Sequence, residues 1–332
     1  MVEKSRIEKP RVIVTRKLLP SVETRMEELF DMGLNISDAP MSRDELAKAM
    51  AECDVLVPTV TDQIDAELIG GAPERLKLIA QFGAGVNNID LDAAKAKGIL
   101  VTNTPGVFTD DTADLTMALI LSVPRRLAEG EKLVRSGEWD GWRPSGMLGH
   151  RVGGKTLGIV GFGRIGEAVA RRASAFGLDI VYNKRKRLPS SMEDDLGVQW
   201  EPDIDRLVAK SDIISLHCPL TDKTENLLNA QRITAMKPSA YLINTSRGEL
   251  VDEDALITAL EGKKIGGAGL DVYTHEPAVN PRLLELSNVV LIPHLGSATF
   301  EGRQASGERV ITNIRIWADG HRPPDQVLRG LD

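Results

Sequence analysis

Residues 156–166 read TLGIVGFGRIG, in which an apolar run typical of a β-strand leads straight into Gly161, Gly163 and Gly166. The segment EAVARRASAF follows with helical periodicity, and another apolar run begins at Leu178. In such a unit the first glycine permits a tight turn, the second lets the backbone approach a pyrophosphate, and the third allows close helix packing. A glycine-rich turn without a ligand is the alternative, and the flanking strand and helix argue against it. We therefore predict a dinucleotide-binding βαβ unit.

Short aliphatic runs alternate with amphipathic stretches over most of the chain. One set of runs starts near positions 11, 54, 76 and 99, and a second near positions 156, 178, 212, 240, 266 and 288. This alternation predicts right-handed βαβ units and parallel sheets. A chain of 332 residues with 42% hydrophobic content is long enough for two cores. We expect an α/β fold with two doubly wound parallel-sheet (Rossmann-like) domains and a cleft between them.

Three segments connect or follow these sets. Residues 110–135 have a helical pattern that Pro124 interrupts, which predicts a kink or the start of a second helix. Residues 137–155 are rich in Gly, Trp and Pro, which indicates an ordered loop or a crossover. Residues 300–318 are amphipathic and predict a final helix.

Composition excludes several classes of protein. The net charge of -7 argues against a broad nucleic-acid-binding face, and no apolar run approaches the roughly 20 residues needed to cross a bilayer. Cys53 and Cys218 are far apart and lack CxxC spacing, so neither a disulfide framework nor a structural zinc site is expected. The first ten residues, MVEKSRIEKP, lack the apolar core of a secretory signal and predict a short disordered arm. These features favour a cytoplasmic protein.

The end of the second strand of the βαβ unit indicates which cofactor is preferred. An NAD-binding unit normally has Asp or Glu there to bind the ribose 2′-hydroxyl. This chain has Asn183, followed by Lys184, Arg185, Lys186 and Arg187. A neutral Asn does not repel a 2′-phosphate, and the basic run can pair with one. We therefore predict that the protein prefers NADP(H) and can also use NAD(H). If the basic run is only a solvated loop, it gives no such preference.

Three polar residues, Arg247, Glu276 and His294, each follow a strand-like run in the second half of the chain. The carboxyl ends of neighbouring strands meet at one crevice, so these side chains form one candidate catalytic site. Reducing a 2-keto acid needs a forked cation to hold the carboxylate and polarise the ketone, and an acid that protonates the alkoxide. A carboxylate beside the histidine orients the imidazole and favours its protonated form. Taken singly, each residue could instead be an ordinary loop residue.

These motifs together resemble the D-isomer-specific 2-hydroxyacid dehydrogenase family, in particular its glyoxylate and hydroxypyruvate reductase branch. The resemblance is carried by VGFGRIG, INTSRGELVDE, GLDVYTHEP and LIPHLGS, with LIAQFGAGVNNID and NTPGVFTDDTADLTMALIL earlier in the chain. It implies a discontinuous substrate domain formed by residues 1–104 and 298–332, and a dinucleotide-binding domain formed by residues 105–297. The periodicity of the sequence does not show that discontinuity.

The resemblance also implies roles for single residues. The expected cofactor contacts beyond those already named are Arg164, Ile165, His217, Cys218, Pro219, Thr245, Asp271, Thr112 and Gly296. For the substrate carboxylate, it implies backbone amides near Ala84 and Gly85, opposite Arg247 and with His294 nearby; a plain glycine turn is the alternative. His217 and Cys218 could in principle start a metal site, but no third and fourth ligands have suitable spacing, so no metal is expected.

Two further residues bear on this assignment. His275 adjoins Glu276, but neighbours along an extended segment point to opposite sides, so His294 is the better acid. In reductases of this branch a tryptophan near Trp142 reaches the site of the partner subunit, whereas Trp139 and Trp142 could equally be core or interface residues.

The predicted function is NAD(P)H-dependent reduction of a small 2-keto acid, glyoxylate or hydroxypyruvate, to the D-2-hydroxy acid by a homodimer. An NAD-dependent dehydrogenase of the D-lactate or D-glycerate type is one alternative. A dinucleotide-sensing, corepressor-like interaction protein is another, which would need a recruitment surface or an extra tail; the sequence is expected to end a few residues after its last helix.

Overall fold

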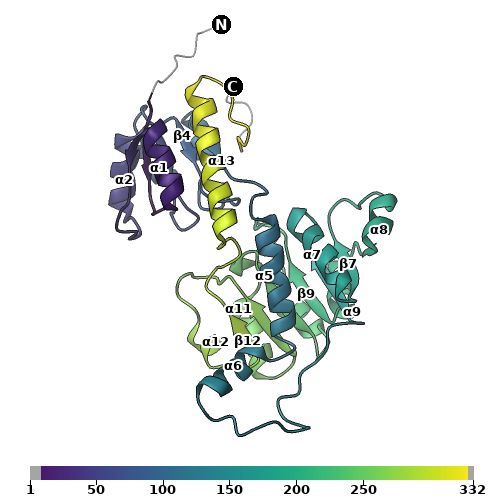
Figure 1. Cartoon of the computed structure of the whole chain (residues 1–332). Coiled ribbons are helices and arrows are strands. Elements are labelled where there is room, and N and C mark those ends of the chain that lie inside the picture. The colour runs from purple at the N-terminus through teal and green to yellow at the C-terminus, as the bar shows by residue number, and fades with distance from the viewer. Residues whose placement is uncertain (1–8, 328–332) are drawn as a thin grey trace. The chain divides into compact units, whose positions relative to one another are not determined.

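The computed structural model describes residues 9–327, so the arm expected at the N-terminus lies almost entirely outside the described residues. The chain divides into two compact units (Figure 1). Unit 1 comprises Met1–Phe108 and Thr299–Asp332, and unit 2 comprises Thr109–Ala298. Each unit has a parallel sheet with helices on both faces, which confirms the predicted α/β fold with two parallel-sheet domains.

Unit 1 contains a five-stranded sheet in the order β2-β1-β3-β4-β5. Its strands are β1 (Arg11–Val14), β2 (Asp31–Gly33), β3 (Val55–Val57), β4 (Leu78–Ala80) and β5 (Leu100–Thr102). Its helices are α1 (Pro20–Leu29), α2 (Arg43–Glu52), α3 (Ala66–Gly71), α4 (Leu91–Ala96) and α13 (Phe300–Ala318). Helices α1 and α13 pack side by side although they lie at opposite ends of the sequence (Figure 1). The predicted final helix is confirmed.

Unit 2 contains a seven-stranded parallel sheet in the order β12-β11-β10-β9-β6-β7-β8. Its strands are β6 (Thr156–Val160), β7 (Asp179–Asn183), β8 (Val198–Trp200), β9 (Ile213–Leu216), β10 (Tyr241–Asn244), β11 (Gly267–Leu270) and β12 (Val289–Leu291). Its helices are α5 (Thr109–Ser122), α6 (Leu127–Arg135), α7 (Arg164–Ala175), α8 (Ser190–Leu196), α9 (Ile204–Lys210), α10 (Ala230–Ala235), the 3₁₀ turn η1 (Gly248–Leu250), α11 (Glu253–Glu261) and α12 (Pro281–Leu284). Around Pro124 the chain ends one helix and begins another, the second of the two predicted alternatives.

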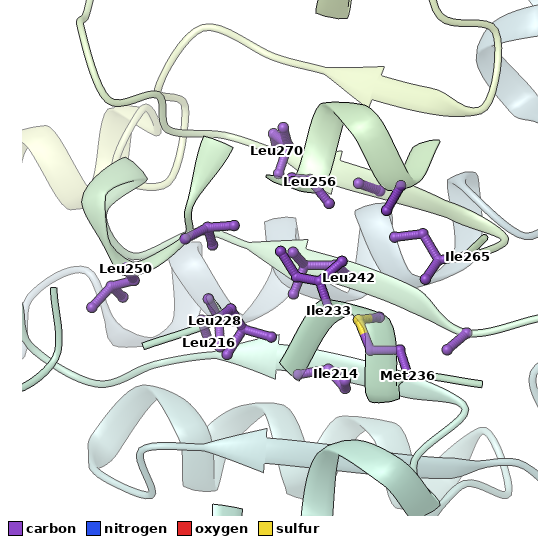
Figure 2. Close-up of a cluster of buried hydrophobic side chains, with 14 of the residues drawn as sticks. Ile214, Leu216, Leu228, Ile233, Met236, Leu242, Leu250, Leu256, Ile265 and Leu270 are labelled. Atoms are coloured by element: carbon purple, nitrogen blue, oxygen red, sulfur yellow. The ribbon is translucent and has the colours of Figure 1, made fainter. Parts of the chain in front are cut away.

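The sheet of unit 2 separates two hydrophobic cores. Figure 2 shows the core in which β9 and β10 meet α10 and α11, with Ile214, Leu242 and Leu256 among its buried side chains. The opposite face packs against α5 and α7, through residues such as Ile120 and Val169. Fully burying one such aliphatic side chain stabilises the fold by roughly 1.5–3 kcal/mol. Strands covered on both faces read as unbroken apolar runs, which is why this sheet was visible in the sequence.

Candidate active site

The strand order of unit 2 changes direction between β6 and β9. From β6 the chain proceeds through β7 to β8 at one edge, then returns to β9 on the other side of β6 and proceeds to β12. Ligands of open α/β sheets bind beyond the carboxyl ends of the strands at such a switch point. The predicted glycine motif follows β6, and His217, Cys218 and Pro219 follow β9, so both segments lie at this point.

The three glycines of the motif are required for different physical reasons. Gly161 has φ +90°, and a Cβ there would lie 2.4 Å from the backbone nitrogen of Cys218. A Cβ on Gly166 would lie 2.4 Å from the carbonyl oxygen of Gly161. By contrast, a Cβ on Gly163 would meet no atom within 4 Å. The first and third glycines therefore allow backbone to pack on backbone, while the second leaves open space where a pyrophosphate could approach.

Helix α7 begins at this open space without a side-chain cap. Gly163 is its N-cap residue and supplies no hydrogen bond to the first turn. Several other helices of the protein begin with a side chain that caps them, such as Asp203 before α9 and Asp252 before α11. The first N–H groups of α7, those of Arg164 and Ile165, are therefore available to an anion, and the helix dipole favours one.

Asn183 ends β7, and its side chain is already engaged. Its Nδ2 donates to the carbonyl oxygens of Glu201 at 2.9 Å and Pro202 at 3.0 Å. Its own carbonyl oxygen accepts the N–H of Gly161 at 3.0 Å, which ties the glycine turn to the end of β7. Asn183 thus has a structural role that the sequence did not reveal, and its Oδ1 remains the side-chain atom that could face a cofactor.

The basic run after Asn183 is not uniform. Arg187 forms an ion pair with Glu193 at 2.7 Å, and its guanidinium lies 5.6 Å from the centre of the Trp200 ring. The side chains of Lys184, Arg185 and Lys186 form no ion pair with any residue in the described part of the chain. Of the four basic residues, these three remain available for a 2′-phosphate.

His294 and Glu276 form a pair, as their positions after β12 and β11 predict. His294 Nδ1 lies 2.7 Å from Glu276 Oε2, and both side chains are about one-third exposed. Glu276 Oε1 accepts the N–H of Tyr273 at 3.0 Å, which fixes the carboxylate. His294 has φ +51°, a left-handed conformation that is uncommon outside glycine, and its N–H donates to the carbonyl of Asp271. The imidazole is therefore held at Nδ1, with Nε2 left for a substrate.

Burial and charge set the protonation of this site. Burial alone raises the pKa of Glu276, but the hydrogen bond and charge of His294, the N–H of Tyr273 and the charge of Arg247 outweigh it, so the pKa is lowered. Burial lowers the pKa of Arg247, against the opposing influence of Glu249 and Glu276. Arginine stays protonated even so, because its unperturbed pKa is above about 12. At neutral pH the site thus combines a carboxylate and a guanidinium.

Arg247 follows β10 in a tightly constrained turn. Its carbonyl accepts from Asn244 Nδ2 at 2.7 Å, and its guanidinium donates to the carbonyl of Ser246 at 2.6 Å. The next residue, Gly248, passes so close to the segment after β11 that a Cβ would lie 2.1 Å from the carbonyl carbon of Tyr273. Gly248 was missed in the sequence, where a glycine directly after the arginine was the available signal.

Asp271, Thr112 and Gly296 form a buried brace beneath the histidine loop. Asp271 accepts the N–H groups of Leu295 at 2.5 Å and Gly296 at 2.8 Å, and Thr112 Oγ1 donates to the Gly296 carbonyl at 2.8 Å. Burial raises the pKa of Asp271, and the two N–H groups act in the opposite direction. The structure thus shows Asp271 and Thr112 holding the loop that carries His294; direct contact with a cofactor stays a prediction.

Two further predicted cofactor residues, His217 and Thr245, directly follow strands β9 and β10. Thr245 is buried, and its hydroxyl lies 2.9 Å from that of Thr116 on α5. His217 Nε2 lies 2.8 Å from Ser215 Oγ, and burial lowers the pKa of His217 to about 4, so the ring is neutral at pH 7. Among the described residues no group of three His, Cys, Asp or Glu side chains is arranged to hold a metal ion.

Ala84 and Gly85 belong to unit 1, in the loop that follows β4. The four carbonyl oxygens of residues 83–86 accept hydrogen bonds, in order, from the Thr104 N–H, Asn103 Nδ2, Gln81 Nε2 and the Ile89 N–H. Within the described part of the chain, the four N–H groups of this loop have no hydrogen-bond partner. Successive unpaired N–H groups are typical of an anion-binding concavity.

A dinucleotide fold with an open glycine cradle (Gly161, Gly163 and Gly166) at its switch point, together with an arginine and a carboxylate–histidine pair, is the arrangement expected of a nicotinamide-dependent oxidoreductase. A family model described as "D-isomer specific 2-hydroxyacid dehydrogenase, NAD binding domain" matches residues 117–296. The chain belongs to the D-isomer-specific 2-hydroxyacid dehydrogenase family, as the sequence motifs indicated.

Relatives with known names and structures cover nearly the whole chain. A glyoxylate reductase from Thermococcus litoralis is 47% identical over 97% of this chain and 98% of its own length. A putative D-isomer-specific 2-hydroxyacid dehydrogenase from Polaromonas has a structure with TM-score 0.91 and 38% identity, covering 96% of this chain and 100% of that one. An NADPH-dependent glyoxylate/hydroxypyruvate reductase from Sinorhizobium meliloti, in complex with NADP and malonate, gives TM-score 0.85 and 34% identity over 96% and 97% of the two chains.

Proposed function

We propose that this enzyme reduces a small 2-keto acid, glyoxylate or hydroxypyruvate, to the D-2-hydroxy acid with NADPH as the preferred donor. The observation that carries the proposal is the 2.7 Å contact between His294 Nδ1 and Glu276 Oε2, in the same unit as the open glycine cradle. The glyoxylate reductases among its relatives support the substrate class.

Each residue of the site has a distinct task in the proposed reaction. The bound nicotinamide would supply the hydride to the keto carbon. Arg247 polarises the ketone with its forked guanidinium, and His294 Nε2 donates the proton that the forming alkoxide needs. Glu276 stays ionised and stabilises the imidazolium. In unit 1, the N–H groups of Ala84 and Gly85 bind the substrate carboxylate, which makes unit 1 the proposed substrate domain.

The direct test is a substrate and cofactor panel. Oxidation of NADPH and of NADH is measured with glyoxylate, hydroxypyruvate, pyruvate and bulkier keto acids. We expect the highest kcat/KM with glyoxylate or hydroxypyruvate. Turnover only in the oxidative direction with NAD would favour the D-lactate or D-glycerate alternative, and no turnover with any pair would favour a dinucleotide-sensing role.

Glu276→Gln is expected to move the pH optimum of keto-acid reduction to lower pH by roughly 1–2 units. The lowered pKa of Glu276 keeps it ionised at neutral pH, where its negative charge favours the protonated imidazole that reduction requires. The measurement is log kcat/KM against pH for both proteins.

The oxidative direction supplies a check on the same variant. Oxidation requires the unprotonated imidazole, so the rising limb of its pH profile should also move to lower pH in Glu276→Gln. Profiles that keep their wild-type positions in both directions would restrict Glu276 to orienting the ring.

Arg185→Ala is expected to raise the KM for NADPH roughly 10- to 100-fold and to leave that for NADH nearly unchanged, because one charge-assisted hydrogen bond to the 2′-phosphate is lost. Arg206→Ala removes an exposed arginine elsewhere in unit 2 and is the matched control. All measurements use one ionic strength, because salt screens phosphate contacts. Asn183→Asp is a less direct test, since Asp cannot donate to the carbonyls of Glu201 and Pro202. A wild-type preference for NADH would contradict the NADPH proposal.

We also propose a homodimer in the cytoplasm. Helix α6 buries none of its side chains, and Trp142 in the segment after it is 83% exposed. Exposed apolar residues grouped in this way are typical of an interaction surface. A role for Trp142 in the site of a partner subunit stays a prediction.

The two cysteines support the proposed cytoplasmic location. Cys53 and Cys218 are buried free thiols, as suits a reducing compartment. None of the described helices is both long and apolar enough to cross a membrane.

A further inference from the structure

Arg303 is a half-buried cation of unit 1, and no carboxylate among the described residues pairs with it. It lies in the first turn of α13, where its backbone N–H donates to Thr299. Its guanidinium lies 6.0 Å from the ring centres of both Phe82 and Phe108. It forms no ion pair or side-chain hydrogen bond with any residue in the described part of the chain.

This environment is costly for a charged group. Among the described arginines, Arg247 and Arg303 are the two whose pKa is lowered, in both cases by burial. A cation in the first turn of a helix also faces the positive end of the helix dipole. Contacts at 6.0 Å are at the outer limit of cation–π attraction, so the two rings compensate only part of this cost. An anionic ligand would compensate the rest.

The loop beside Arg303 is arranged to take such a ligand. The Phe82 ring faces the guanidinium, and Phe82 directly precedes residues 83–86. The four carbonyl oxygens of residues 83–86 accept hydrogen bonds, whereas their four N–H groups have no partner among the described residues. Among the described residues, N–H donors without acceptors thus follow directly after the residue whose ring faces a cation without a counter-ion. Both features belong to unit 1 and require no residue of unit 2.

We propose that Arg303 is a substrate-binding residue that holds the carboxylate of the 2-keto acid together with the N–H groups of residues 83–86. This inference rests on the proposed function for the identity of the anion. A planar carboxylate matches both the forked guanidinium and the row of N–H groups. Arg303 therefore contributes to selecting acids over neutral aldehydes and ketones, a task separate from that of Arg247 at the ketone.

The test compares Arg303→Met with wild type and with Arg315→Met, which removes an exposed arginine from the last turn of the same helix. Methionine keeps most of the side-chain volume on the two phenylalanine rings and removes the charge. We expect the KM for glyoxylate to rise roughly 10- to 100-fold, with kcat at saturation and the Kd of NADPH changed little. Arg303→Lys should fall between the two, and Arg315→Met should match wild type.

A binding measurement separates this inference from the proposed function. Oxalate carries carboxylates but has no aldehyde or ketone carbon that could accept a hydride. Titration of the enzyme–NADPH complex with oxalate should show the same 10- to 100-fold loss of affinity in Arg303→Met. Failure of wild type to reduce any keto acid would defeat the proposed function, while the oxalate titration would still decide the role of Arg303. Unchanged KM and unchanged oxalate affinity would show that Arg303 only packs on the rings. If Arg303→Met does not fold, the same two measurements on Arg303→Lys decide, because an ammonium loses the fork.

Discussion

His294→Ala is expected to lower kcat for glyoxylate reduction by roughly 10²- to 10⁴-fold while NADPH binds almost normally. The imidazole acts as the acid mainly in the transition state, when negative charge forms on the substrate oxygen. It contributes less to binding, because the glycine cradle follows β6, whereas His294 follows β12, and three strands of the sheet lie between those two. Stopped-flow kinetics at saturating substrate and a fluorescence titration with NADPH measure the two quantities.

His275→Ala is the matched control for this variant. His275 precedes Glu276 in the chain but is exposed, whereas His294 is bonded to the carboxylate. We expect His275→Ala to retain near-wild-type kcat. A kcat for His294→Ala within a few-fold of wild type, with an unchanged pH profile, would remove His294 from the role of proton donor.

Arg247→Lys is expected to lower kcat/KM by roughly 10²- to 10⁴-fold, the effect of losing about two charge-assisted hydrogen bonds to substrate. An ammonium is a point charge and cannot direct two hydrogen bonds in one plane at the substrate. A guanidinium can donate to the Ser246 carbonyl at 2.6 Å and still present its other N–H groups to the substrate in the same plane, which an ammonium cannot do. Steady-state kinetics with glyoxylate measure the loss.

The control for Arg247→Lys is Arg206→Lys, which makes the same exchange at an exposed position of unit 2. That variant should keep the wild-type kcat/KM. Near-normal KM and kcat for Arg247→Lys would place Arg247 outside the site. The proposed mechanism would then lack the group that polarises the ketone.

Most strands were predictable because they are buried on both faces. The runs at β6, β9 and β10 are continuous and apolar, and they were identified from the sequence. Strands β2 and β8 were missed. Each has three residues at the edge of its sheet, and DMG and VQW lack the apolar length that distinguishes a strand from a loop. Edge strands acquire their structure from pairing with one neighbour, which a local pattern does not encode.

The candidate site was predictable to the extent that it depends on strand ends. The pair formed by Glu276 and His294 followed from their positions after consecutive strands, and the pairing is confirmed at 2.7 Å. The bonds of Asn183 to Glu201 and Pro202 were not predictable. Neither was the engagement of Arg187 by Glu193. In each case a side chain that the sequence suggested for a ligand has partners from a neighbouring segment.

The sequence by itself determined the fold class, the dinucleotide-binding unit and the polar residues that end the strands of unit 2. These properties depend on periodicity and on short motifs, in which glycine or burial constrains the nearby backbone. Only the tertiary structure decided which of those residues have partners. It placed Asp271 and Thr112 under the histidine loop. Among the described residues, it left Arg303 without a counter-ion and the N–H groups of residues 83–86 without acceptors. The physical reason is that hydrogen bonding and desolvation depend on neighbours in space. Thr112 and Gly296, for example, are bonded to each other across 184 positions of sequence.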